Sequence, residues 1–163
     1  MKGIPVFIAG LATGAMLLSS NASQGELTPN SIPPILTGLG FDPKPSGTGT
    51  WDIVSTRGGL DVPIAVALSQ SGRKLWMTVF LAEFDDKARA DAPRLLELLR
   101  KNFETQPGHF FVVKDAPTSG PVKDSLKMAI ALDNRGIVPS DLKREIDKLT
   151  DDVVASQSLW QKP

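Results

Sequence analysis

The chain has 163 residues, in which 18 lysines and arginines balance 18 aspartates and glutamates. This balance creates no overall field that would attract a phosphate backbone, so we expect no nucleic-acid partner. Cysteine is absent, which excludes disulfides, thiol nucleophiles and cysteine-bound metal centres. Hydrophobic residues make up 41% of the chain and charged residues 22%, a composition typical of one folded globular domain.

The first 22 residues have the pattern of an export signal. A positive end at Met1–Lys2 precedes an uncharged apolar stretch over 4–18, which is shorter than the roughly 20 residues of a membrane span. Small residues in Ser20-Asn21-Ala22 follow, as signal peptidase requires. We predict a signal peptide over 1–22 and one domain over 23–163, periplasmic or secreted, with no stable membrane span after cleavage. An uncleaved anchor is the alternative.

The first part of the mature chain predicts one helix, a loop and a strand. Apolar residues at helical spacing follow Ser/Thr and Pro signals for a helix start, so we predict a helix over 29–39. The segment 42–49 is rich in Pro and Gly and predicts a loop. A first strand is predicted over 51–55.

The segments 62–68 and 75–81 alternate with period two and predict a β-hairpin. Pro63 cannot donate a ladder hydrogen bond, which favours an edge or strand-end position there.

The second half predicts a helix, two strands and a last helix. The second helix, over about 91–105, carries an apolar stripe made of Leu95, Leu96, Leu99 and Phe103. Strands over 109–113 and 126–132 flank a loop over 114–124. Ser140 is predicted to cap the last helix, whose buried face comprises Leu142, Ile146, Leu149, Val153 and Trp160. The expected fold is α+β, in the order α-β-β-β-α-β-β-α, with an antiparallel sheet packed against helices.

Both faces of this sheet are apolar. One face, which the helices should cover, combines the Val, Ile, Leu and Met positions of the hairpin and of the strand over 126–132. The opposite face carries Ala65, Ala67, Trp76 and Phe80, and it is too apolar to be left in water. Either the last helix covers it, or it binds a second copy or a client segment, with Trp76 and Phe80 as anchors.

No catalytic or metal-binding motif is present. His109 is the only histidine, and it precedes an apolar run in the manner of a strand-end residue, with no serine in a nucleophile elbow. The paired acids Asp85-Asp86 and Asp151-Asp152 are typical of a solvated surface. We therefore expect no cofactor and no metal. A small enzyme using carboxylates with Arg57 or Arg135 is the alternative.

Several local signals occur in a fixed order along the chain: Leu39-Gly40-Phe41, Ser71-Gly72-Arg73-Lys74-Leu75, Asn102-Phe103, Leu132-Asp133-Asn134-Arg135-Gly136-Ile137 and Asp141-Leu142. These segments, together with the order of elements, resemble the bacterial YbjN-like family, whose domain is similar to the type III secretion chaperone fold. The resemblance implies a non-enzymatic, chaperone-like binding domain prone to form homodimers, and it supplies no catalytic residues. Family members are commonly cytoplasmic, whereas this chain carries an export signal.

The sequence as a whole predicts an exported, non-enzymatic domain that binds a protein or peptide client or a second copy of itself. Two alternatives are an envelope-associated structural protein and the small enzyme described above.

Overall fold

The computed structural model describes residues 25–84, 92–115 and 123–161. The predicted signal peptide over 1–22 lies outside these residues. None of the described helices is both long enough and apolar enough to cross a membrane.

The domain is α+β, as predicted, and is built on a six-stranded antiparallel sheet with the order β1-β2-β3-β4-β6-β5. The strands are β1 (Lys44–Gly47), β2 (Thr50–Arg57), β3 (Leu60–Leu68), β4 (Lys74–Phe84), β5 (His109–Asp115) and β6 (Lys123–Asp133). The helices are the short 3-10 helix η1 (Pro29–Ser31), α1 (Ile32–Gly38), α2 (Ala92–Glu104), α3 (Pro139–Ala155) and α4 (Gln157–Trp160).

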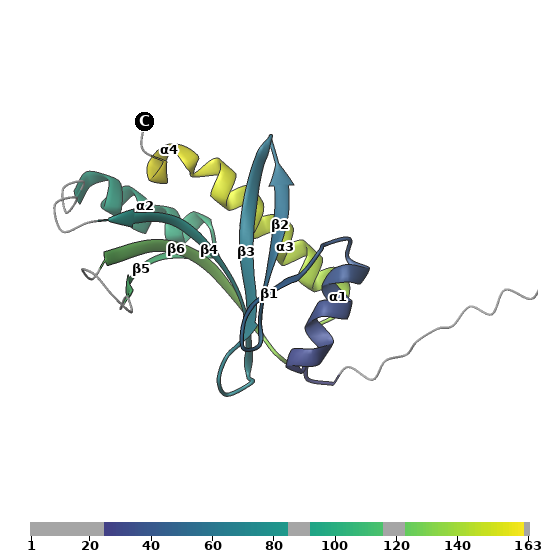
Figure 1. Ribbon diagram of the computed structural model, residues 1–163. Helices are drawn as coiled ribbons and strands as arrows, with labels where there is room; N and C mark the ends of the chain where they lie inside the picture. The colour runs from purple at the N-terminus through teal and green to yellow at the C-terminus, as the bar shows by residue number, and fades with distance from the viewer. Residues whose placement is uncertain (1–24, 85–91, 116–122, 162–163) are drawn as a thin grey trace, which may run out of the picture.

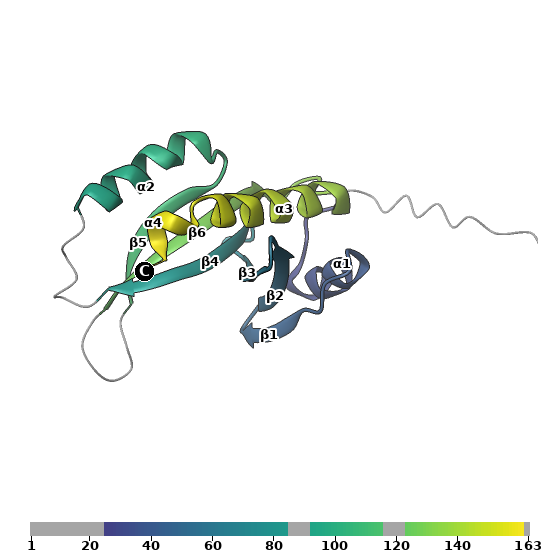
Figure 2. The same cartoon turned by 90° about the horizontal axis from the view of Figure 1, so that it is seen from above.

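The long helices lie on one side of the sheet (Figures 1 and 2), which we call the helix face; the other side is the open face. Alternation along β3, β4 and β6 sends their larger aliphatic residues to the helix face. The fully buried side chains of the resulting core are Ile32, Leu36, Ile53, Ile64, Leu75, Met77, Leu126, Met128, Ile130, Leu142, Ile146 and Leu149. One core therefore unites the strands, α1 and α3.

Asn134 fastens the N-terminal segment to the sheet. The Leu27 amide donates to its Oδ1 at 2.8 Å, while its Nδ2 donates to the carbonyl oxygens of Leu27 (2.9 Å) and Gly72 (2.7 Å). Asn134 is buried, and a buried amide side chain needs such partners. The turn after β6 thereby joins the chain start to the β3–β4 turn.

The loop predicted over 42–49 was wrong, because β1 occupies 44–47 and pairs with β2. All four β1 residues are exposed, so no hydrophobic alternation marks the strand in the sequence. The edge position predicted for Pro63 is confirmed on the side of β3 that faces β4. Pro63 faces Val54 of β2, and β3 pairs with β4 only from Ala65 onward.

Helix α3 buries four of the five side chains predicted for the last helix, all except Trp160, but it starts differently. Pro139 is its first residue and Val138 its N-cap, so the predicted cap at Ser140 was wrong. A proline at the first helical position fixes the backbone angle there without sacrificing a hydrogen bond. The helix ends at Ala155, and Trp160 lies on the separate α4, where its indole donates to the Val153 carbonyl at 3.0 Å.

Helix α2 forms where predicted, but three of the four residues of its predicted stripe face outward; the side chain of the fourth, Leu95, lies outside the described part of the structure. Leu96, Leu99 and Phe103 are exposed, whereas Leu98, on the other side of the helix, is buried. Asn102 attaches the helix to β5, since its side chain accepts from the Phe110 amide and donates to the Phe110 carbonyl.

Candidate functional site on the open face of the sheet

The four residues predicted to bind a partner lie together on the open face. Trp76 and Phe80 point to this side of β4, and Ala65 and Ala67 point to the same side of β3. Trp76 and Phe80 are four residues apart, so their backbones are about 13 Å apart along the strand. Their spacing is suited to contact with several residues of an extended segment.

The residues beside Trp76 on the neighbouring strands are small. Across β4, Trp76 stands between Ala67 of β3 and Ala131 of β6. Thr78, the next open-face residue of β4, stands between Ala65 and Ala129. The strand neighbours of Trp76 on this face are therefore too small to cover its ring, and the residue remains half-buried.

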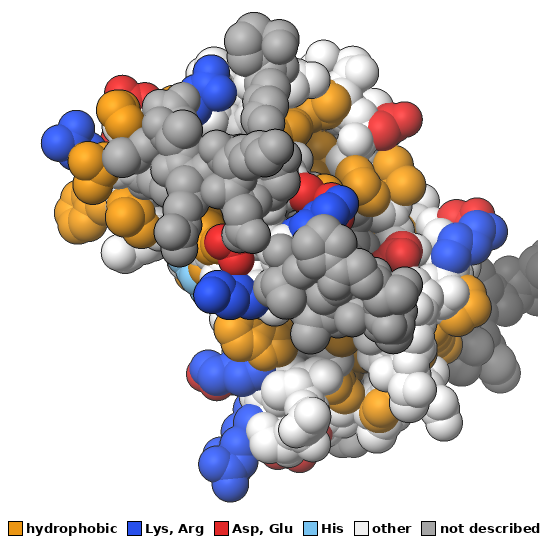
Figure 3. All heavy atoms as spheres, turned by 60° about the vertical axis from the view of Figure 1, so that its left-hand side comes forward, with side chains coloured by type: hydrophobic (Ala, Val, Ile, Leu, Met, Phe, Trp, Pro, Cys, Tyr) orange, Lys and Arg blue, Asp and Glu red, His pale blue; other side chains and the backbone are white. Residues whose placement is uncertain are grey.

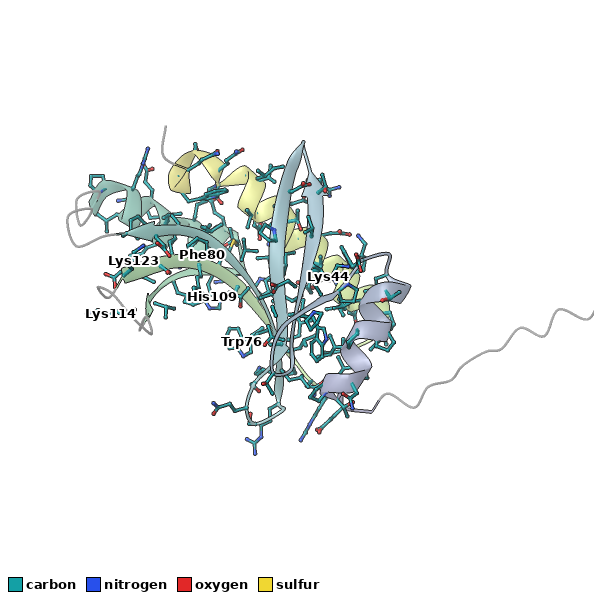
Figure 4. The ribbon with its side chains drawn as sticks, viewed as in Figure 1. Lys44, Trp76, Phe80, His109, Lys114 and Lys123 are labelled. Carbon is teal, nitrogen blue, oxygen red and sulfur yellow. The ribbon has the colours of Figure 1, made fainter. Side chains whose placement is uncertain are left out.

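The structure adds two aromatic side chains of β5, His109 and Phe111. The His109 ring lies 6.2 Å from the Trp76 ring, edge to face, and 5.5 Å from the Phe111 ring, measured between centroids. Figure 4 shows Trp76 and His109 close together on the sheet. Ala129 lies between β4 and β5 on β6 and is 0% exposed, because rings from both neighbouring strands meet above it.

Phe80 extends this surface toward the other end of the strands. It faces Lys127 of β6, which in turn faces Phe111 of β5. The Phe80 side chain is 50% exposed, an unusual position for a large aromatic residue. We call Trp76, Phe80, His109 and Phe111 the aromatic patch.

Ion pairs border the aromatic patch at both ends. Lys74 Nζ lies 2.6 Å from Asp133 at one end, and Lys123 Nζ lies 2.7 Å from Glu83 at the other. The hydrogen bond from Lys74 lowers the pKa of Asp133, which keeps this carboxylate charged. An apolar centre within a polar rim is the usual anatomy of a protein-binding surface.

The last helix does not cover the open face, so that alternative for Trp76 and Phe80 was wrong. Helix α3 packs on the helix face through Leu142, Ile146, Leu149 and Val153, and Figure 2 shows α2 and α3 on that same side. Among the described residues, no helix lies over the aromatic patch.

The sequence placed His109 at a strand end, and it is the first residue of β5. Its membership of the aromatic patch was missed, together with that of Phe111. Residues 110–113 are all apolar, so alternation could not decide which of them share the open face. The pairing of His109 with Ala129 decides it, and pairing across strands is not visible in a local pattern.

The structure pairs each arginine of the possible enzyme site with a different carboxylate. Arg57 donates two hydrogen bonds to Asp151, of 2.5 and 2.9 Å, and Arg135 lies 3.4 Å from Glu26. Both arginines are exposed, so these contacts are surface ion pairs. Burial raises the pKa of Asp152, which is paired with Lys148 at 2.6 Å.

Asp85 and Asp86 lie outside the described residues. Within the described part of the chain, no three His, Asp or Glu side chains gather in a way that could hold a metal ion.

Comparison with known proteins supports the fold alone. The sequence matches no protein-family model, and no curated protein matches it. The structure is similar to the crystal structure of YbjN from E. coli, a proposed transcription regulator, with a TM-score of 0.59 and 13% sequence identity. The similarity covers 81% of this chain and 93% of that chain. The fold is therefore YbjN-like.

Proposed function

We propose that this chain is a non-enzymatic domain of the YbjN-like family that binds a protein or peptide client through the aromatic patch. The observation that carries the proposal is the cluster of three rings, in which His109 lies between Trp76 and Phe111, with the half-exposed Phe80 on the same face of the sheet. Aromatic side chains at the centre of a surface commonly supply most of the binding free energy.

An extended apolar segment is the client that suits this geometry. Neighbouring open-face positions on a strand are about 7 Å apart, which matches the spacing of alternate side chains in an extended peptide. The ion pairs Lys74–Asp133 and Lys123–Glu83 would lie at the rim of such a contact and contribute to orientation.

The test uses peptides selected from a random library on the immobilised chain. The double variant Trp76→Ser with Phe80→Ser should bind a selected peptide at least about 30-fold more weakly, because truncating a central aromatic anchor costs about 2 kcal/mol or more. Isothermal titration calorimetry gives the affinity, and circular dichroism reports whether the variant is folded.

Val54→Ser is the matched control. Val54 is also exposed on the open face but lies on β2, away from the aromatic patch. A folded double variant with unchanged affinity would contradict the proposal, as would an equal loss in Val54→Ser.

Export of the protein is a further part of the proposal and rests on the sequence of residues 1–22. Intact-mass analysis of protein recovered from the envelope fraction of its native host should show a chain that begins at Ser23. A chain that retains Met1 would instead support an anchored protein.

A further inference from the structure

The imidazole ring of His109 lies inside the aromatic patch. Its centroid is 6.2 Å from that of the Trp76 ring and 5.5 Å from that of the Phe111 ring. The backbone of His109 faces Ala129 of β6, which has no exposed surface. Figure 3 shows the pale blue side chain of the chain's only histidine at the surface, beside hydrophobic side chains and a basic one. One of the four rings of the aromatic patch can therefore gain a proton.

We propose that His109 makes client binding depend on pH, with the neutral ring completing the aromatic patch and the protonated ring weakening the contact. This inference rests on the proposed function of the aromatic patch. Histidine is the side chain that ordinarily changes charge between about pH 5 and 8. A neutral imidazole adds a flat aromatic surface beside Trp76, whereas an imidazolium needs water or a negative partner. An apolar client that covers the ring removes the water.

The side chains around His109 on the open face supply no negative partner. Trp76 of β4, Ala129 of β6 and Phe111 of β5 are uncharged. Lys127 is the next open-face residue of β6 and faces Phe111, so the first charge along that strand is positive. A protonated His109 would therefore be a second positive charge on this part of the face.

The carboxylates at the two ends of the aromatic patch are already paired. Asp133 is four residues from Ala129 along β6, which corresponds to about 13 Å. It lies 2.6 Å from Lys74, and Glu83 at the other end of the patch lies 2.7 Å from Lys123. Neither ion pair has a spare negative charge for His109.

The acidic residues of the neighbouring helices lie behind the sheet. Glu104 at the end of α2 pairs with Lys101, and Asp152 of α3 pairs with Lys148. Both helices are on the side of the sheet opposite the aromatic patch (Figure 2). A proton on His109 thus adds a charge that these groups do not balance, and an apolar client has to cover it.

Calorimetric titration at two pH values tests the proposal. The probe is a peptide with blocked termini, selected on the immobilised chain at pH 8 and free of Asp, Glu and His, so that only the protein changes charge. The unaltered protein should bind this peptide at least about tenfold more weakly at pH 5 than at pH 8. His109→Phe keeps an aromatic ring but takes up no proton, so its affinity should be the same at both pH values.

Two further variants serve as controls. His109→Gln also takes up no proton, and it carries the test if circular dichroism shows that His109→Phe is poorly folded. Asp152→Asn is the matched control, because burial raises the pKa of Asp152 and makes it another group that gains a proton as the pH falls. Asp152 lies on the helix face, so Asp152→Asn should keep the full pH dependence of peptide binding.

Proton NMR of the single imidazole gives an independent measurement. Saturating peptide should move the midpoint of the His109 titration to lower pH, because a client that prefers the neutral ring opposes its protonation. Equal affinity at pH 8 and pH 5 in the unaltered protein, or a pH dependence that His109→Phe retains, would overturn this inference and leave the proposed function intact. A folded protein that selects no peptide at pH 8 would contradict the proposed function itself, and this inference with it.

Discussion

Helices α2 and α3 lie on the same face of the sheet, but they use their apolar residues in opposite ways. Helix α3 buries Leu142, Ile146, Leu149 and Val153 against the strands. Among the described side chains of α2, only Leu98 is buried, whereas Leu96, Leu99 and Phe103 face outward. Helix α3 thus completes the core, whereas α2 leaves an apolar surface exposed to solvent.

The difference lies in how the apolar residues are distributed around each helix. In α3 the apolar residues form a single stripe, and that stripe is the side that meets the sheet. In α2, Leu98 and Asn102 attach the helix to the sheet, while Leu96, Leu99 and Phe103 form a second apolar side. Helical periodicity identifies residues that share a side, but not which side meets the sheet.

The largest effect expected from this comparison is on Ile146. Ile146→Ala should lower the free energy of unfolding by about 2–5 kcal/mol, because it removes a fully buried side chain and leaves a cavity. Leu99→Ala should change it by no more than about 0.5 kcal/mol, because Leu99 is exposed in the single chain. Urea denaturation gives both values. If both variants lost the same free energy of unfolding, the two helices would not differ in how they use their apolar residues.

A smaller effect is expected on the exposed side of α3, at the Arg57–Asp151 pair. The hydrogen bond from Arg57 lowers the pKa of Asp151 below its unfolded value of 3.8. The pair therefore stabilises the fold above about pH 4, and this contribution is lost as the pH falls through the lowered pKa. Both side chains are half exposed, so solvent screens the pair strongly.

Asp151→Asn should consequently lower the melting temperature only slightly at pH 7, and the difference from the unaltered protein should disappear in acid. Thermal unfolding followed by circular dichroism at several pH values measures this. A difference that grows as the pH falls would contradict the assigned pKa direction.

Strong local patterns in the sequence predicted most of the elements. The β3–β4 hairpin, β6 and α3 were predicted because buried residues recur with the period of a strand or a helix. Strand β1 was missed because its four residues are all exposed and only its hydrogen bonds to β2 define it. The outward stripe of α2 could not be predicted, since it depends on where Leu98 meets the rest of the core.

Local alternation also predicted part of the candidate site, whereas the part that depends on strand pairing was missed. Trp76, Phe80, Ala65 and Ala67 belong to alternating strands, so their common face could be derived. His109 and Phe111 join them only because β5 pairs with β6 in one register, which puts His109 beside Ala129. That register brings together residues distant in the sequence, and no local pattern contains it.

The hydrogen bonds between Leu27 and Asn134 have a consequence for the order in which the chain becomes structured. They join residues 107 positions apart, so they cannot form until the turn that follows β6 has been synthesised. Closing a loop of this length carries a large entropic cost, which slows folding. The attachment of Leu27 to the sheet therefore depends on a part of the chain that is made near the end of synthesis.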